Sequence, residues 1–239
     1  MTTSRHGLSM PRFVLVLMTV AAWMPCAAQS VTEIGRFQEE IDRFRSWDAK
    51  NSSPPDAVLF IGSSTIRLWE TASLFPRLRV VNRGFGGAQI SDVLDRLVEV
   101  LDPHDPSVIV FYTGDNDVAD GKSAEQVRDD FQHFIDEVRR RKAGTPVIFL
   151  AIKPSLNRWA LWPEMKRANE MISELASNAE DVFFVDLAAI TLNDAGTPRP
   201  EFFVDDGLHL SEEGYAAWSA LLADVLTGML DKNGAYVSE

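Results

Sequence analysis

The sequence contains a single cysteine, Cys26, among its 239 residues. It lies in an N-terminal segment that has the pattern of a cleaved export signal. Once that segment is removed no thiol remains, which excludes a disulfide, a cysteine nucleophile and a thiolate metal site. Lipidation of Cys26 is the alternative, and Pro25 disfavours it because a lipidation site prefers a small, flexible residue there.

The chain also lacks an apolar run long enough to span a bilayer. The run from Phe13 to Met24 is shorter than the roughly 20 residues that a membrane helix needs. Arg12 precedes this run and the small residue Ala28 follows it, so we expect a signal peptide, residues 1–28, that is cleaved after Ala28. An uncleaved anchor is the alternative. We therefore expect an exported protein, periplasmic or secreted, with no stable membrane span.

Positive charge is scarce, with 23 Lys and Arg residues against 35 Asp and Glu residues and a formal net charge of −12. The predicted signal peptide carries Arg5, Arg12 and no acid, so its removal would leave a net charge of −14 on residues 29–239. Such a surface repels nucleic acid and anionic membranes, and we expect neither as a partner.

Five short apolar runs alternate with helical patterns along the rest of the chain. Runs that are apolar on both faces are typical of parallel strands buried on both sides of a sheet. The predicted strands are residues 57–61, 78–82, 108–112, 147–152 and 182–186. The predicted helices are residues 31–49, a short stretch ending at Glu70, 90–101, 123–142, 164–177 and 211–230, and residues 188–204 are mostly loop. This alternation predicts one parallel α/β domain, residues 29–239.

Histidine is also scarce, and only His209 lies where chemistry could use it. His6 leaves with the signal peptide, His104 precedes the third strand at the wrong end of the sheet, and His133 points away from the apolar face of its helix. Asp206 stands three residues before His209. A carboxylate at this spacing can bind one imidazole nitrogen and leave the other as a general base.

Polar residues follow four of the predicted strands at one edge of the sheet, where open parallel sheets bind ligands. They are Gly62-Ser63-Ser64, Asn82 with a glycine loop, Gly114-Asp115-Asn116-Asp117, and Asp206 with His209. A serine here can attack a carbonyl carbon while His209 takes its proton. Backbone N–H groups of the serine and the glycine loop, with the Asn116 amide, can stabilise the oxyanion. Such chemistry requires neither a metal nor an organic cofactor.

The same residues form four blocks that resemble those of the SGNH (GDSL-type) hydrolases, in the family's order. The blocks are Phe60-Ile61-Gly62-Ser63-Ser64-Thr65-Ile66, Asn82-Arg83-Gly84-Phe85-Gly86-Gly87, Gly114-Asp115-Asn116-Asp117 and Asp206-Gly207-Leu208-His209. The resemblance implies a flavodoxin-like three-layer α/β/α sandwich with a five-stranded parallel sheet of order 2-1-3-4-5. It also implies that Ser64 is the nucleophile, His209 the base and Asp206 its orienter, with an oxyanion hole of Ser64 N–H, Gly87 and Asn116.

The nucleophile block departs from the family's usual Gly-Asp-Ser, because Ser63 replaces the aspartate. Two serines are therefore adjacent, and the assignment of Ser64 depends on the register of the match. The block is similar to a branch of the family that reads Gly-Ser-Ser, near its acetylhydrolase-like members. The Gly-x-Ser-x-Gly elbow of α/β-hydrolases is absent, since Ile66 occupies the place of its last glycine.

Two other motifs are incomplete. Three aspartates after the third strand resemble the start of a calcium loop: Asp115, Asp117 and Asp120. Ala119 and Gln126 occupy positions where that loop needs ligands, so we expect no metal and expect Asp117 to brace the loop that carries Asn116. Gln89 replaces the last glycine of a dinucleotide fingerprint.

Aromatic and polar residues near these loops are candidates for a substrate pocket, with burial in the core as an equal alternative for the aromatic ones. The candidates are Ser63, Asn82, Phe85, Trp159 and Trp162, with Trp69, Phe202 and Phe203 as further aromatics. An aromatic wall suits a short acyl chain and a sugar ring equally, so we expect a small-molecule or saccharide ester as substrate.

These patterns together predict an exported serine esterase that hydrolyses short-chain acyl or acetyl esters through an acyl-enzyme. A carbohydrate O-acetylesterase and a lysophospholipase or thioesterase are alternatives on the same site. A non-catalytic carbohydrate-binding protein on this fold is the alternative from another class, and it would not need to keep Ser64 together with His209.

Overall fold

The structure is a computed structural model that describes residues 1–2 and 35–233. Contacts within the chain divide it into two units, Met1–Arg36 and Phe37–Glu239. The predicted signal peptide lies outside the described residues apart from Met1 and Thr2, and so does the start of the helix predicted from residue 31. The sheet and the helices that surround it belong to the second unit.

Five strands form a single sheet in the order β2-β1-β3-β4-β5, and every neighbouring pair is parallel. They are β1 (Val58–Gly62), β2 (Val80–Gly84), β3 (Val108–Tyr112), β4 (Val147–Leu150) and β5 (Val182–Val185). This arrangement confirms the predicted fold class and strand order.

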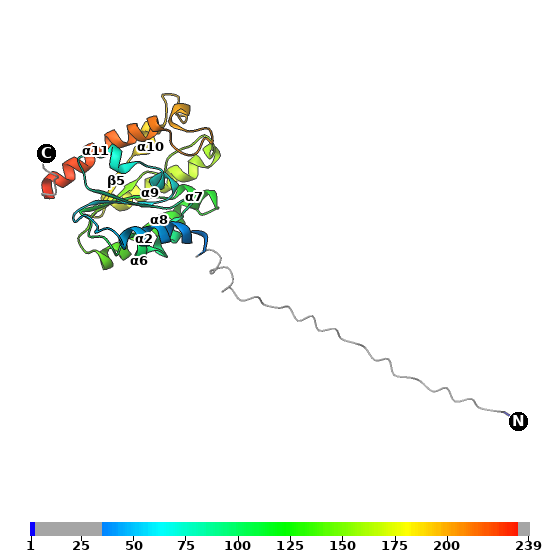
Figure 1. Ribbon diagram of the computed structural model, residues 1–239. Coiled ribbons are helices and arrows are strands. Elements are labelled where there is room, and N and C mark those ends of the chain that lie inside the picture. Colours follow the sequence, from blue (N-terminus) through cyan, green and yellow to red (C-terminus); the bar gives the residue numbers. More distant parts are fainter. Residues whose placement is uncertain (3–34, 234–239) are drawn as a thin grey trace. The chain divides into compact units, whose positions relative to one another are not determined.

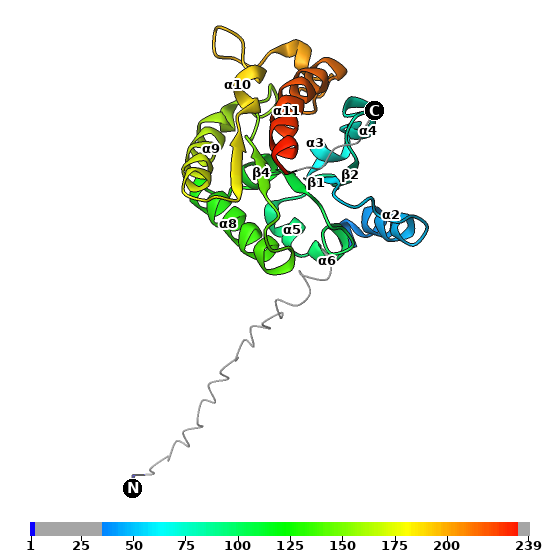
Figure 2. The same cartoon turned by 90° about the vertical axis from the view of Figure 1, so that its left-hand side faces the viewer.

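Helices cover both faces of the sheet, so the second unit has three layers (Figure 1). Leu59 and Ile61 point to one face and Val58 and Phe60 to the other, because side chains alternate along a strand. The first face packs against α2 (Gln38–Asp48), α5 (Ile90–Leu94), α6 (Leu97–Val100), α8 (Ala124–Arg141) and α9 (Trp162–Ser177). The second packs against α3 (Ser64–Arg67), α4 (Thr71–Leu74), α10 (Leu187–Thr191) and α11 (Glu212–Asn233). Figure 2 shows α9 and α2 at opposite ends of the helix layer that covers the first face.

Two helix predictions need correction. Residues 90–101 form two helices, α5 and α6, and the break at Arg96 buries that side chain while leaving Val98 61% exposed. No glycine or proline marks this break in the sequence. The region expected to be mostly loop, residues 188–204, contains most of α10 and a turn of 3₁₀-helix, Pro200–Phe202. The side chain of Asp186 caps α10 by accepting a hydrogen bond from the Ala189 N–H at 3.0 Å.

Glycine is required at the turns that follow β1 and β3. Gly62 ends β1 with φ +154°, and a Cβ atom there would lie 2.0 Å from the Tyr112 carbonyl oxygen. Gly114 precedes α7 (Asp115–Ala119) with φ +113°, and a Cβ there would lie 2.5 Å from Ile152 Cδ1. Both positions therefore require glycine, and both direct the chain into a short helix whose first residues face the same edge.

None of the helices in the described ranges has the length and apolarity that a membrane crossing requires.

Candidate active site

Three side chains form a hydrogen-bonded line at the carboxyl edge of the sheet. Ser64 is the first residue of α3, and its Oγ lies 2.9 Å from His209 Nε2. His209 Nδ1 lies 2.6 Å from Asp206 Oδ2. Because a carboxylate only accepts hydrogen bonds, Nδ1 carries the proton and Nε2 is left to accept the Ser64 hydroxyl. This is the arrangement in which a histidine can deprotonate a serine.

Backbone N–H groups fix the Asp206 carboxylate in place. Its Oδ1 accepts hydrogen bonds from the N–H of Leu208 at 2.8 Å and the N–H of His209 at 2.9 Å. Desolvation raises the pKa of Asp206, but the hydrogen bonds from the His209 ring and from these N–H groups outweigh it and lower that pKa to about 2. Asp206 is therefore ionised at any pH where a histidine base could act.

The structure brings Ser64, and not Ser63, to the histidine. Ser63 is the N-cap residue of α3, its side chain is fully buried, and its Oγ has no hydrogen-bond partner among the described residues. Ser63 N–H donates to the Tyr112 carbonyl at 3.0 Å, which ties the start of α3 to β3. A buried Ser63 cannot line an open substrate pocket, contrary to that expectation.

Asn116, the second residue of α7, is tied to the loop after β2. Its Nδ2 donates to the Ala88 carbonyl oxygen at 3.0 Å. Gly87, which precedes Ala88, has φ +76° in the turn of that loop. The residue expected to brace Asn116 is also in contact with this region, because Asp117 accepts the Ile90 N–H at 3.2 Å.

The three aspartates that resembled a calcium loop point to different partners. Asp117 contacts Ile90 N–H as described, and Asp120 accepts a hydrogen bond from Gln89 Nε2 at 2.9 Å. Asp115 lies 3.2 Å from Lys153 Nζ. Within the described part of the chain, no group of three or more His, Cys, Asp or Glu residues is placed to hold a metal ion.

Most other candidates for the substrate pocket are core residues. Phe85 is fully buried and packs edge-on against Phe37 with ring centroids 4.9 Å apart, so it cannot wall an open pocket. The Asn82 amide is used by the backbone, since Nδ2 donates to the carbonyls of Ile66 at 2.7 Å and Trp69 at 3.1 Å. Its Oδ1 accepts the Gly84 N–H at 2.9 Å. Three further aromatics also belong to the buried core: Trp69, Phe202 and Phe203.

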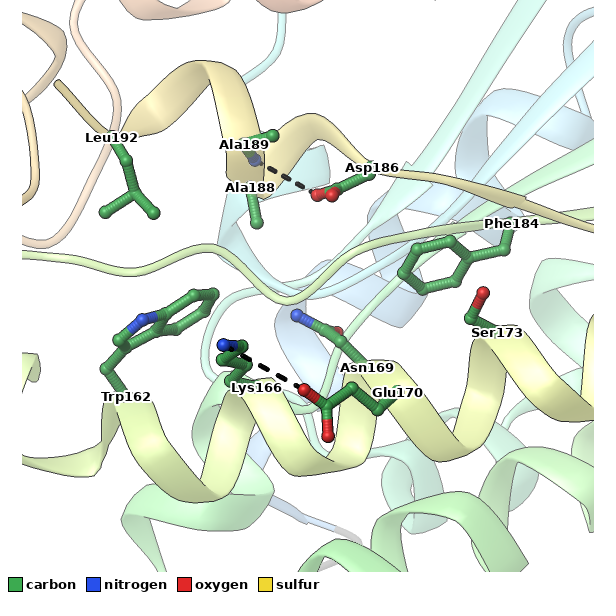
Figure 3. A pocket seen from close by; sticks show the side chains of 10 residues that line it. All are labelled: Trp162, Lys166, Asn169, Glu170, Ser173, Phe184, Asp186, Ala188, Ala189 and Leu192. Carbon is green, nitrogen blue, oxygen red and sulfur yellow. Dashed lines mark hydrogen bonds and ion pairs between the residues drawn. The ribbon is translucent and has the colours of Figure 1, made fainter. Parts of the chain in front are cut away.

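The two remaining candidates for the pocket, Trp159 and Trp162, lie near the surface after β4. Trp159 is 37% exposed, and its ring stacks with Trp162 at a centroid distance of 6.4 Å. Trp162 also lines a pocket of about 450 Å³ between α9 and α10 (Figure 3). Several polar groups of this pocket are paired within the protein, as Asn169 is with both backbone groups of Ile152. Neither Ser64 nor His209 lines it, so it is distinct from the hydrogen-bonded line.

Sequence reasoning missed a buried charged cluster that adjoins Asn116, defined here by Asp115, Lys153 and Arg158. Lys153 Nζ and Arg158 Nη1 lie 3.2 Å and 3.3 Å from the same oxygen, Asp115 Oδ2. Arg158 Nη2 also donates to Asn116 Oδ1 at 3.0 Å. The only sequence signal was the position of Lys153 and Arg158 after the fourth strand, at the same edge of the sheet as the other blocks.

The loop after β4 also contacts the segment that carries the histidine. Asn157 N–H donates to the Gly207 carbonyl at 2.9 Å, and Asn157 Nδ2 donates to the Asp206 carbonyl at 3.3 Å. One loop therefore contacts both Asn116, through Arg158, and the backbone of the Asp206–His209 turn.

Comparison with protein families matches residues 67–217 to the GDSL-like lipase/acylhydrolase family. This range contains Gly87, Asn116, Asp206 and His209, and it begins just after Ser64. No curated protein matches the chain.

Several solved structures share this fold. A protein from Streptococcus pneumonia, described provisionally as a platelet activating factor, has 26% identity and a TM-score of 0.74, with 85% of this chain and 100% of that chain covered. A GDSL-like lipase from Bacteroides thetaiotaomicron has 19% identity and a TM-score of 0.66, covering 79% and 97%. A family 3 carbohydrate esterase from Clostridium thermocellum has 19% identity and a TM-score of 0.58, covering 74% and 99%. The family match covers more than half of the sequence and the fold agrees with it, so the chain belongs to the GDSL-like lipase/acylhydrolase family.

Proposed function

We propose that this protein is an exported serine esterase that hydrolyses short-chain carboxylic esters, acetyl esters among them. Membership of the family supports ester hydrolysis in general. The observation that carries the more specific proposal is the hydrogen-bonded line from Ser64 through His209 to Asp206. A binding module would not need a serine placed 2.9 Å from an oriented imidazole nitrogen.

In the first half of the reaction, Ser64 Oγ attacks the ester carbonyl carbon while its proton passes to His209 Nε2. Asp206 stabilises the imidazolium that forms. The negative charge that develops on the carbonyl oxygen is stabilised by the Ser64 N–H and the Asn116 amide, with Gly87 as the third donor position that the family resemblance implies. The bond to the alcohol then breaks, His209 returns its proton to the leaving oxygen, and an acyl-Ser64 remains.

In the second half, His209 accepts a proton from water as the water oxygen attacks the acyl carbon. Collapse of this second tetrahedral intermediate releases the carboxylic acid and returns the proton to Ser64 Oγ. The same donors stabilise both oxyanions, because the carbonyl oxygen occupies the same position in each half of the reaction.

A carbohydrate O-acetylesterase is the second candidate within this chemistry. The specific observation in its favour is the stacked pair Trp159 and Trp162, since an exposed aromatic face suits the apolar face of a sugar ring. Acetylated xylan oligomers tested beside a series of p-nitrophenyl esters of increasing chain length would separate this activity from a preference for simple or long-chain esters. A preference for long chains would favour the lysophospholipase or thioesterase alternative.

The test of the main proposal compares wild type, Ser64→Ala and Ser63→Ala on p-nitrophenyl acetate. We expect Ser64→Ala to lower kcat by about 10⁴-fold or more, since it removes the nucleophile. Ser63→Ala should stay active, because the Ser63 hydroxyl is buried away from His209. If Ser63→Ala is the inactive variant, the nucleophile is Ser63. If wild type hydrolyses neither activated nor saccharide acetates, the esterase proposal is wrong.

We also propose that residues 1–28 are removed on export and that residues 29–239 form the mature domain. The Phe13–Met24 run flanked by Arg12 and Ala28 supports this processing. Expression of the full chain in a bacterium, followed by mass measurement of the exported product, should give a chain that begins at Gln29. A product that keeps residues 1–28, or one lipidated on Cys26, would contradict it.

A further inference from the structure

The amide of Asn116 is held between one group that can only donate a hydrogen bond and one that can only accept. Arg158 Nη2 donates to its Oδ1 at 3.0 Å, and the Ala88 carbonyl accepts from its Nδ2 at 3.0 Å. A guanidinium has no acceptor and a carbonyl oxygen has no donor. With the amide flipped, two donors would face each other at Arg158 and two acceptors would face each other at Ala88. The two partners therefore select one orientation of the amide.

This orientation leaves one N–H of Asn116 unassigned. An amide nitrogen carries two hydrogens, and Ala88 is the only acceptor found for Nδ2 within residues 35–233. The partly exposed Asn116 therefore keeps a donor for a substrate oxyanion. The hydrogen bond from Arg158 also draws electron density toward Oδ1, which strengthens the N–H groups as donors.

Arg158 is itself held by buried charge. Asp115, 4% exposed, forms ion pairs with Arg158 and with Lys153, whose Nζ also donates to Thr65 Oγ1 at 3.3 Å. Thr65 is the neighbour of the nucleophile, so the cluster links α3 to Asn116.

We propose that Arg158 is a positioning residue for ester hydrolysis, which fixes the Asn116 amide in the orientation that donates to the oxyanion. The inference rests on the proposed function, in which Asn116 belongs to the oxyanion hole. Arg158 acts through Asn116, because its Nη2 donates to that amide and its buried Nη1 is ion-paired with Asp115.

The experiment uses a fluorophosphonate, because its reaction does not depend on the natural substrate. Ser64 Oγ attacks phosphorus, a P–O bond forms, the P–F bond breaks, fluoride leaves, and the serine proton passes to His209. The P=O oxygen takes the place of the oxyanion. The rate of adduct formation is followed by intact-protein mass for wild type, Asn116→Ala, Arg158→Ala, Arg158→Lys and the double variant Asn116→Ala/Arg158→Ala. Hydrolysis of p-nitrophenyl acetate supplies kcat and KM.

We expect Asn116→Ala to slow phosphonylation by about 100-fold, as loss of one oxyanion donor does. Arg158→Ala should slow it by about 10- to 100-fold, lower kcat by a similar factor and leave KM within about 3-fold, since only a transition-state contact is misplaced. Arg158→Lys should be slowed as well, because an ammonium cannot span Asp115 and Asn116 as a planar guanidinium does. The double variant should be no slower than Asn116→Ala, and added methylguanidinium should restore part of the rate to Arg158→Ala alone.

The matched control is Arg141→Ala. Arg141 is similarly buried, with its side chain 20% exposed against 18% for Arg158, and it also bridges two acids, Asp102 and Glu137. It lies at the end of α8, before β4, and its loss should leave both rates unchanged. Thermal unfolding of each variant shows whether it is folded. If Arg158→Ala is not folded, the milder Arg158→Lys variant is compared with Asn116→Ala in its place.

The remaining outcomes distinguish failure of the positioning role from failure of the proposed function. Arg158 variants that react like wild type, while Asn116→Ala is slow, would overturn the positioning role and leave the esterase proposal intact. The positioning role is also refuted if the losses from the two substitutions multiply in the double variant. A wild-type protein that is not labelled at Ser64, or an Asn116→Ala variant that is labelled at the wild-type rate, would refute the proposed site and with it this inference.

Discussion

Asp206 is the residue whose charge sets the proton position on His209. Replacing it by Asn places a group that can donate next to Nδ1, so the imidazole proton moves to Nε2, where it can no longer accept the Ser64 proton. We expect Asp206→Asn to lower kcat by about 10³- to 10⁴-fold with little change in thermal stability, measured on p-nitrophenyl acetate. Asp205→Asn, at the exposed neighbouring carboxylate, is the control and should keep wild-type kcat.

The same residue bears on the pH dependence of the reaction. A depressed carboxylate pKa means that the charge of Asp206 is present above its pKa of about 2 and is lost only as the pH falls through that value. The acid limb of the wild-type rate profile above pH 4 should therefore report another group. A loss of kcat that follows a titration near pH 4, and that disappears in Asp206→Asn, would contradict the hydrogen-bonded geometry around this carboxylate.

For individual residues, the sequence predicted partners that spacing or a motif identifies, and it missed a partner outside the motifs. Asp206 and His209 are three residues apart, so spacing alone suggested their contact. Asn116 and Arg158 are 42 residues apart, and nothing in either segment identifies the other. Core packing likewise decided that Phe85 is buried, because an aromatic residue in a glycine loop fits a core and a pocket wall equally well.

Among the elements, the attachment of α3 to β2 matters most, because α3 carries Ser64. Asn82 of β2 makes this attachment by donating to the carbonyls of Ile66 in α3 and of Trp69 just after it, while its Oδ1 accepts the Gly84 N–H within β2. Asn82→Ala would remove all three hydrogen bonds, although the Ile66 and Trp69 carbonyls still accept the backbone N–H groups of Trp69 and Thr71. We expect a cost of about 2 kcal/mol of unfolding free energy. We also expect kcat to fall by about 10-fold at temperatures where the variant is folded, because the nucleophile is less well placed.

Denaturant unfolding and steady-state kinetics check both parts of this expectation. Asn178→Ala is the matched control, since Asn178 makes one exposed hydrogen bond, to the Glu174 carbonyl at 2.8 Å, at the end of α9. It should change stability by no more than about 0.5 kcal/mol. An Asn82→Ala variant as stable and as active as wild type would show that α3 is held by other contacts.

The helices and strands that the sequence predicted are those with a clear pattern of apolar or capping residues. Four strands were found because they are apolar runs that no amphipathic helix would show, and β3 begins and ends where predicted, at Val108 and Tyr112. The second strand contains polar residues, and β2 begins at Val80, two residues later than predicted. The start of α8 was found from its capping box, in which Ser123 Oγ accepts the Gln126 N–H at 3.3 Å. The five-residue helix α10 is too short to show a periodicity, although its N-cap, Asp186, is a local signal that directly follows β5.

For the molecule as a whole, His104 links folding to pH at the end of the sheet opposite the site. It is 2% exposed, its Nδ1 lies 2.7 Å from Ser53 Oγ, and its Nε2 has no hydrogen-bond partner among the described residues. Burial, followed by the nearby Arg83 charge, lowers the pKa of His104 from 6.5 to about 4. The remaining charged groups around the ring act in both directions: Asp48, Lys142 and Asp105.

The sign of the effect follows from proton counting. Between pH 6.5 and about 4 the unfolded chain binds a proton on His104 that the folded protein does not, so stability falls as the pH falls through this window. Above it the imidazole is neutral in both states and contributes nothing. We expect a contribution of about 3 kcal/mol to the loss of unfolding free energy between pH 7 and pH 4.

Urea unfolding of wild type, His104→Gln and His133→Gln across this range isolates the contribution. His104→Gln should lose less stability than wild type on acidification, because it removes the buried group that charges in the unfolded chain. The exposed His133 should have no such influence, so His133→Gln should follow the wild-type curve. Parallel curves for wild type and His104→Gln would mean that the imidazole is already charged in the folded protein, with Asp48 and Asp105 outweighing the effects of burial and of Arg83.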